Sequence, residues 1–151
     1  FEKLVDEVAG SDSILLVSAD HGFVDAPPEK RIRVADYPEF RNCLQVPLCG
    51  EPRLAYCYVR HDKRQEFEAY VEAVFSGKAQ LYLSQDLVDD NLYGLGEAHP
   101  ELASRTGDYT LVMQDDHVII DSLPGDKMPQ LVGYHGGLSS REVHVPLIMV
   151  A

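Results

Sequence analysis

The sequence predicts an α/β domain in which a mostly parallel sheet is flanked by helices and interrupted by a small α+β insertion. Two apolar runs, at residues 13–20 and 145–150, have the length and composition of strands buried on both faces of a sheet. Between them, strand-like and helix-like patterns alternate with a more polar outer face. We therefore expect residues 1–29 and 106–151 to form the sheet core, and residues 30–105 to form an inserted lobe.

The first apolar run has the surroundings of a strand in an open sheet. Apolar residues recur at helical spacing over residues 1–10, and Gly10 is a suitable end for that helix. After a short turn, the apolar run ends in the polar tripeptide Asp20-His21-Gly22. Ligands of open α/β sheets bind at the carboxyl ends of strands, so a site is expected there.

The rest of the chain divides into shorter predicted elements. Residues 53–60 alternate like a half-exposed strand, residues 65–75 carry a helical stripe, and residues 80–83 form another short strand. Residues 109–114 and 118–121 have the pattern of two strands joined as a hairpin. The chain closes with the second apolar run, which we expect to be a buried strand.

Composition restricts the partners of this chain. Its formal net charge is -12, from 25 acidic and 13 basic side chains, and such a field repels a nucleic-acid duplex. Any phosphate-bearing substrate would need positive charge from bound cations or from a further part of the protein. No apolar run approaches the roughly 18 residues needed to cross a membrane.

The cysteines predict the cellular location of the protein, and the first residues predict that the chain is a fragment. Cys43, Cys49 and Cys57 are odd in number and include no C-x-x-C pair, which favours a reducing, cytoplasmic location. The chain begins at Phe1, without an initiator methionine or a signal pattern. We interpret it as a fragment of a longer protein.

Two short loops carry the residues best suited to chemistry. In the first, a carboxylate (Asp20) stands beside an imidazole (His21), a combination that suits a divalent ion such as Zn²⁺, and Gly22 allows a sharp turn. In the second, His135 precedes two glycines that permit close approach of a ligand. Each loop also has a simpler interpretation, as a cap or salt bridge in the first case and as a flexible loop with an exposed histidine in the second.

Other polar clusters favour structural roles. His99 is expected at a helix start, His61 at a solvated strand end, His144 at the edge of the core, and residues 115–117 (Asp-Asp-His) in a solvated turn. Four tyrosines in the middle of the chain fit core packing, with stacking on a nucleobase as the alternative: Tyr56, Tyr58, Tyr70 and Tyr82.

Taken together, the two loops resemble motifs of a known family. Residues 18–22 (Ser-Ala-Asp-His-Gly) resemble the second metal-ligand motif of the alkaline phosphatase superfamily. Residues 133–148 resemble the final ligand motif and closing strand of its phosphodiesterase-like members, nearest the nucleotide pyrophosphatase/phosphodiesterase branch. The resemblance covers roughly residues 1–25 and 107–151, and it implies an alkaline-phosphatase-like sheet.

The resemblance implies a two-metal hydrolase of phosphoric esters. Asp20 and His21 would ligate the metal that also binds the nucleophilic hydroxyl, and His135 would ligate the second metal. The ions are usually zinc and sometimes manganese, a Ser or Thr attacks phosphorus, and a metal-activated water releases the product. The substrate would be a small phosphorylated molecule such as a nucleotide or a phosphodiester, with phosphodiester or nucleotide pyrophosphate bonds as leading targets.

The chain departs from the family pattern in its missing parts. No Asp is followed four residues later by His, and the only threonines, Thr106 and Thr110, do not stand where the family keeps its nucleophile. The nucleophile and remaining ligands are therefore expected upstream, no catalytic residue is assigned here, and the fragment alone is predicted to be inactive.

Two other readings stay open beside the hydrolase. The chain could be a non-catalytic binding or assembly lobe with an incomplete metal site. A cupin-like metal domain is disfavoured, because such sites gather several histidines on neighbouring strands whereas these motifs are single and distant. The oligomeric state is not indicated by the sequence.

Overall fold

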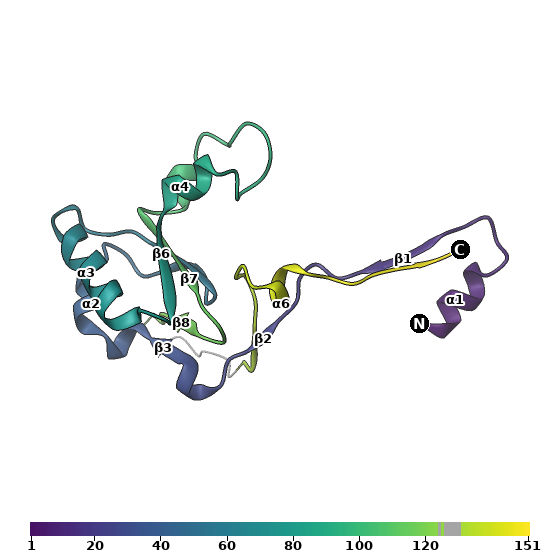
Figure 1. Ribbon diagram of the computed structural model, residues 1–151, viewed down its shortest axis with the longest axis horizontal. Coiled ribbons are helices and arrows are strands. Elements are labelled where there is room, and N and C mark those ends of the chain that lie inside the picture. Colours follow the sequence, from purple (N-terminus) through teal and green to yellow (C-terminus); the bar gives the residue numbers. More distant parts are fainter. Residues whose placement is uncertain (124, 126–130) are drawn as a thin grey trace.

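The computed structural model describes residues 1–123, 125 and 131–151. Figure 1 shows an elongated molecule, in which a lobe of sheet and helices is connected to a narrow two-stranded ribbon that runs away from it. Helix α1 (Glu2–Val8) lies beside the far end of this ribbon, and α6 (Ser140–Val143) lies where the ribbon meets the lobe. No helix within the described ranges is long and apolar enough to cross a bilayer.

The lobe is built on a four-stranded antiparallel sheet with the strand order β4-β5-β7-β6. Its strands are β4 (Cys49–Glu51), β5 (Leu54–Cys57), β6 (Ala79–Leu83) and β7 (Tyr109–Met113). All five residues of β7 are buried, because this strand is central and has neighbours on both edges. Three strands of this sheet, β4 to β6, thus lie within the predicted insertion at residues 30–105, and the fourth, β7, lies after it.

Two helices supply the apolar layer of the lobe. Helices α2 (Pro38–Cys43) and α3 (Arg64–Phe75) pack against each other and contribute to one core cluster with β5 and β7. In α3 the buried residues Phe67, Val71 and Phe75 recur every four positions, which is the stripe that predicted this helix. Phe40 of α2 contacts the rings of Phe67 and Phe75, so aromatic packing fixes the pair.

The remaining elements of the lobe are short turns and helices that link its strands and longer helices. They are the 3₁₀ turns η1 (Pro28–Lys30), η2 (Val34–Asp36) and η3 (His61–Lys63) and the helices α4 (Ser84–Asp89) and α5 (Leu102–Arg105). His99 Nδ1 accepts a hydrogen bond from the Glu101 amide just before α5, in agreement with its predicted place at a helix start.

The predicted hairpin between residues 109–114 and 118–121 is wrong. Strand β8 (Val118–Ile120) leaves the four-stranded sheet and pairs in parallel with β3 (Arg31–Arg33). The reason is that β5 and β6 already occupy both edges of β7. Asp115, at φ 48°, turns the chain away from that sheet.

The ends of the chain form antiparallel pairs. Strand β1 (Leu15–Ser18) pairs with β10 (Leu147–Val150), and β2 (Val24–Asp25) pairs with β9 (Gly133–Tyr134). The mixed α/β class is confirmed, but β3–β8 is the one parallel pair among the described strands. The two apolar runs thus do meet side by side, in the opposite relative direction from the expected parallel one.

The apolar runs are also exposed, where burial on both faces was expected. Leu16 and its cross-strand partner Met149 retain 62% and 66% of their accessible surface. Among the described residues, only the short helix α1 lies against this ribbon, near its far end, and no sheet or helix layer covers the rest of it (Figure 1). Strands of this composition are normally covered on both faces, so the ribbon has the character of an uncovered sheet interior.

This ribbon is expected to make the 151-residue chain self-associate, because an exposed apolar strand pair offers both surface and edges to another copy. Replacing Met149 with lysine should weaken self-association by roughly tenfold, measured as the dimerisation constant in sedimentation velocity. The matched control is Leu95→Lys, which changes a 98% exposed leucine in a loop of the lobe. Equal association of both variants and the parent chain would contradict this expectation.

Candidate metal site

Strand pairing brings the two predicted loops together. Asp20-His21-Gly22 precedes β2, His135 directly follows β9, and Val24 lies opposite Tyr134 in the β2–β9 pair. As a result the imidazoles of His21 and His135 are stacked, with ring centroids 3.8 Å apart and planes inclined by 13°. Phe23 packs edge-on against both rings, at 4.9 Å from His21 and 5.4 Å from His135. Two side chains that are 114 positions apart in sequence thus form one cluster.

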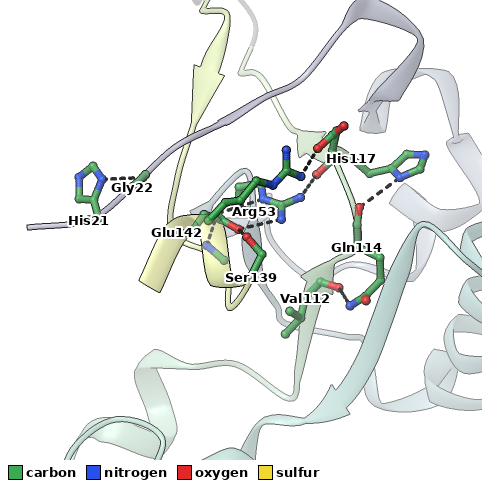
Figure 2. Close-up of polar contacts among 11 residues, drawn as sticks. His21, Gly22, Arg53, Val112, Gln114, His117, Ser139 and Glu142 are labelled. Carbon is green, nitrogen blue, oxygen red and sulfur yellow. Dashed lines mark hydrogen bonds and ion pairs between the residues drawn. The ribbon is translucent and has the colours of Figure 1, made fainter. Parts of the chain in front are cut away.

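The orientation of His21 leaves one ring nitrogen available. Its Nδ1 lies 3.0 Å from the Gly22 carbonyl oxygen. Figure 2 marks this contact between His21 and Gly22. A carbonyl only accepts, so Nδ1 carries a proton in this contact, and in the neutral imidazole Nε2 then has the free lone pair. Nε2 lies 3.6 Å from Asp20 Oδ2, while Asp20 Oδ1 accepts a 3.0 Å hydrogen bond from the His21 amide. An imidazole lone pair and a carboxylate oxygen therefore lie close together.

The donor chemistry fits a divalent metal, although the cluster is not a closed metal site. Imidazole nitrogen and carboxylate oxygen are ordinary ligands of Zn²⁺. Within residues 1–123, 125 and 131–151, no three His, Cys, Asp or Glu side chains are grouped so as to hold one ion. The Asp20 side chain is 88% exposed and has open space around it for further ligands.

Behind these loops lies a buried ion pair that the sequence did not reveal. Arg53, in the turn between β4 and β5, donates from Nε to Glu142 Oε1 at 3.0 Å and from Nη2 to Glu142 Oε2 at 2.8 Å. Its Nη1 donates to the His117 carbonyl oxygen at 2.5 Å, so the guanidinium lies between α6 and the start of β8 (Figure 2). Arg53 is 0% exposed and Glu142 is 2% exposed. The pair joins the lobe to the C-terminal motif.

The Glu142 carboxylate also holds the loop that follows His135. Oε1 accepts a hydrogen bond from the Gly137 amide at 2.8 Å, and Oε2 accepts one from the Ser139 hydroxyl at 2.6 Å. A Cβ at position 137 would lie 2.8 Å from both carboxylate oxygens. A side chain at position 137 would therefore push the Glu142 carboxylate away from the Gly137 amide.

The surroundings of Glu142 lower the pKa of its carboxyl group. Burial is the largest single influence and raises the pKa, because it disfavours the charged carboxylate. Hydrogen bonds from Arg53, Ser139 and the Gly137 amide, with the positive charge of Arg53, outweigh burial and lower the pKa to about 2. Glu142 is consequently ionised at neutral pH and its charge is matched by that of Arg53.

The sequence around Glu142 contains a recognisable local motif, but it does not indicate that Arg53 is the partner of Glu142. Ser139-x-x-Glu142 is the spacing of a helix capping box. In the structure Ser139 instead donates to the Glu142 carboxylate. Arg53 lies 89 positions earlier in the chain, in a segment whose alternation indicated only a strand. Only tertiary structure could reveal this pair.

The other polar clusters have mixed outcomes. His117 is buried, where a solvated turn was expected, and its Nδ1 lies 3.2 Å from the Gln114 carbonyl oxygen. Desolvation by burial lowers its pKa. Asp116, by contrast, is partly exposed and forms an ion pair with Arg141. His144 is exposed, where a place at the edge of the core was expected, because β10 has no covering layer.

The tyrosines of the middle segment serve mainly structural contacts. Tyr70 packs against Phe40 and Phe75 at the edge of the core. Tyr58 donates from its hydroxyl to the Ser104 carbonyl oxygen. Tyr70 therefore agrees with the prediction of core packing, whereas Tyr56, Tyr58 and Tyr82 are not among the residues that pack against the core cluster.

The fold is alkaline-phosphatase-like, and the resemblance found in the motifs is confirmed at the level of the fold. Murine and human ectonucleotide pyrophosphatase/phosphodiesterase 5 each match with a TM-score of 0.67, at 15% and 18% identity, over 98% of this chain and 36% of theirs. Phosphonoacetate hydrolase from Sinorhizobium meliloti 1021, in complex with phosphonoformate, matches with a TM-score of 0.68 at 18% identity, over 99% of this chain and 38% of that one.

A further structure of the murine protein, inactive and in complex with AMP, matches with a TM-score of 0.61 at 16% identity over 90% of this chain and 33% of its own. No family model and no curated protein matches the sequence. The chain spans little more than a third of the length of the solved structures that it resembles.

Proposed function

We propose that this chain is the C-terminal part of a metal-dependent hydrolase of phosphoric esters, with phosphodiester or nucleotide pyrophosphate bonds as its targets. The observation that carries the proposal is the contact between the His21 and His135 rings, beside Asp20, in an alkaline-phosphatase-like fold. Neighbours of that fold bind AMP and phosphonoformate, which supports a small phosphorylated substrate.

Each site residue has a role in this proposal. Asp20 and His21 hold one divalent ion, through a carboxylate oxygen and Nε2, and His135 holds the second. Zinc is the preferred metal and manganese the alternative, and when bound the pair supplies positive charge for the phosphoryl group and lowers the pKa of the attacking hydroxyl. The nucleophilic Ser or Thr and the remaining ligands belong to another part of the complete protein, so the 151-residue chain alone is inactive.

The charge and surface of the chain support this assignment. A chain with a net charge of -12 repels an anionic substrate unless cations offset that charge, which bound metals would do. The exposed β1–β10 ribbon supports a further sheet layer in the complete protein, with residues 1–29 and 106–151 in the shared core and residues 30–105 as an inserted lobe. Cys43, Cys49 and Cys57 are free thiols, which supports a cytoplasmic location.

The test is hydrolysis of bis-p-nitrophenyl phosphate and p-nitrophenyl phosphate by the complete protein with Zn²⁺ or Mn²⁺. His21→Ala and His135→Ala should each lower kcat/KM for the diester by about 100-fold or more, because each removes a metal ligand. His61→Ala is the matched control, since that exposed histidine lies in η3, on the lobe. Turnover that is indifferent to both site histidines would sink the proposal.

A non-catalytic binding or assembly lobe is the second candidate. It is favoured by one observation, the lack of a three-ligand group among the described residues. The same assay separates the two candidates. A binding lobe predicts no turnover of either ester by the complete protein, and no dependence of its stability on Zn²⁺.

A further inference from the structure

We infer that the buried Arg53–Glu142 pair is a positioning device that sets the relative placement of His21 and His135 for metal binding. The inference rests on the proposed function. It adds residues that touch neither metal nor substrate and that act through the two loops. Glu142 is the residue in which contacts to both loops converge.

Glu142 contacts the first loop through its backbone. Its carbonyl oxygen accepts a 2.8 Å hydrogen bond from the Gly22 amide, the residue next to His21. The contact is close, because a Cβ at position 22 would lie only 1.9 Å from the Arg141 carbonyl oxygen. The His21 loop is therefore seated directly on the backbone of α6.

Glu142 contacts the second loop through its side chain. The Gly137 amide and the Ser139 hydroxyl both donate to its carboxylate, and these residues follow His135 by two and four positions. A Cβ at Gly136 would lie 2.7 Å from Glu51 Cβ, so the loop is also pressed against β4. One residue thus holds the backbone beside both histidines.

Arg53 fixes the orientation of that carboxylate. Its two parallel hydrogen bonds to Glu142 form the bidentate geometry that restricts a carboxylate most strongly, and its third, to the His117 carbonyl, anchors it in the lobe. The pair is fully buried, and a buried ion pair is weak evidence for a purely stabilising role. Its placement between the lobe and both histidine loops points to positioning.

The experiment measures Zn²⁺ affinity of the complete protein by competition with a chelator, in variants shown to be folded by circular dichroism. Glu142→Gln keeps the shape of the side chain but turns an amide donor toward Arg53 or Gly137, so the loops shift. We expect Zn²⁺ affinity to fall about tenfold or more, as for other residues behind metal ligands. Arg53→Lys, which keeps the charge but loses the bidentate contact, should lower it by a smaller factor.

A second readout reports the placement of the rings without metal. The metal-free protein should show nuclear Overhauser contacts between the ring protons of His21 and His135, which are stacked at 3.8 Å. Glu142→Gln should weaken these contacts. Leu111→Ala is the control for stability alone, because it opens the core of the lobe in β7 and touches neither loop. It should leave both Zn²⁺ affinity and the ring contacts unchanged.

The outcomes separate this inference from the proposed function. If His21→Ala and His135→Ala weaken Zn²⁺ binding but Glu142→Gln does not, the positioning role is overturned and the metal site stands. If Leu111→Ala weakens binding as much as Glu142→Gln, the pair acts only through stability. If neither histidine affects Zn²⁺ binding, the proposed function fails first.

Discussion

Replacing Gly22 with alanine is expected to lower the free energy of unfolding by roughly 2–4 kcal/mol. The new Cβ would lie 1.9 Å from the Arg141 carbonyl oxygen and 3.0 Å from its carbon, both of which are backbone atoms that cannot rotate away. The loop must lift from α6, and the 2.8 Å hydrogen bond from the Gly22 amide to the Glu142 carbonyl is then lost. The measurement is urea denaturation followed by circular dichroism.

The matched control for this substitution is Gly133→Ala in β9. A Cβ at position 133 would meet Phe23 Cδ1 at 3.5 Å, an ordinary van der Waals contact, and the added methyl group should change stability by less than about 1 kcal/mol. The two variants add the same atom within the same pair of loops. Equal stability of the two would show that the contact between Gly22 and α6 is not maintained in solution.

Acidification is expected to remove about 3 kcal/mol of stability through Glu142, since each unit of pKa shift corresponds to about 1.4 kcal/mol. The pKa of this carboxyl falls from 4.5 to about 2 on folding, so the folded state favours the ionised form. The contribution is therefore fully present above about pH 5 and is lost as the pH falls toward 2. Protonation would leave the charge of Arg53 buried without its partner.

The measurement is the free energy of unfolding between pH 2 and pH 6 for the parent chain and for Glu142→Gln. The difference between the two should shrink as the pH falls from 5 to 2, because the variant has no proton to take up at this position. Asp116→Asn is the control, since the Asp116–Arg141 pair is partly exposed and screened by solvent. A constant difference between parent and Glu142→Gln across the range would contradict the assignment.

Local patterns were enough to locate the best-defined elements and the site loops. The stripe at Phe67, Val71 and Phe75 predicted α3, because a helix core face repeats about every 3.6 residues. Asp20, His21 and His135 were placed in one site because each loop lies beside a strongly apolar strand. The structure brings the two histidines into contact, and their role as metal ligands stays a prediction.

Patterns could not decide which strands pair. The runs at residues 109–114 and 118–121 were each recognisable, yet their proximity in sequence suggested a hairpin that does not form. Pairing depends on which edges remain free once β5 and β6 have joined β7, and those strands lie more than 20 residues away from β7. Likewise, the apolar residues of β1 and β10 predicted strands buried on both faces. Whether a strand is buried depends on which other elements pack over it, and the strand's own sequence does not specify them.

By itself, the sequence determined the α/β class, the helical stripe of the lobe and the position of the two histidine loops. These depend on residue type and on spacings of a few positions, which act before any long-range contact forms. Only the tertiary structure decided the antiparallel pairing of the chain ends, the stacking of His21 on His135 and the link from Arg53 to Glu142. The role of Arg53 depends on its burial and on its ion pair with Glu142. Both arise only when segments 89 positions apart in the sequence pack together.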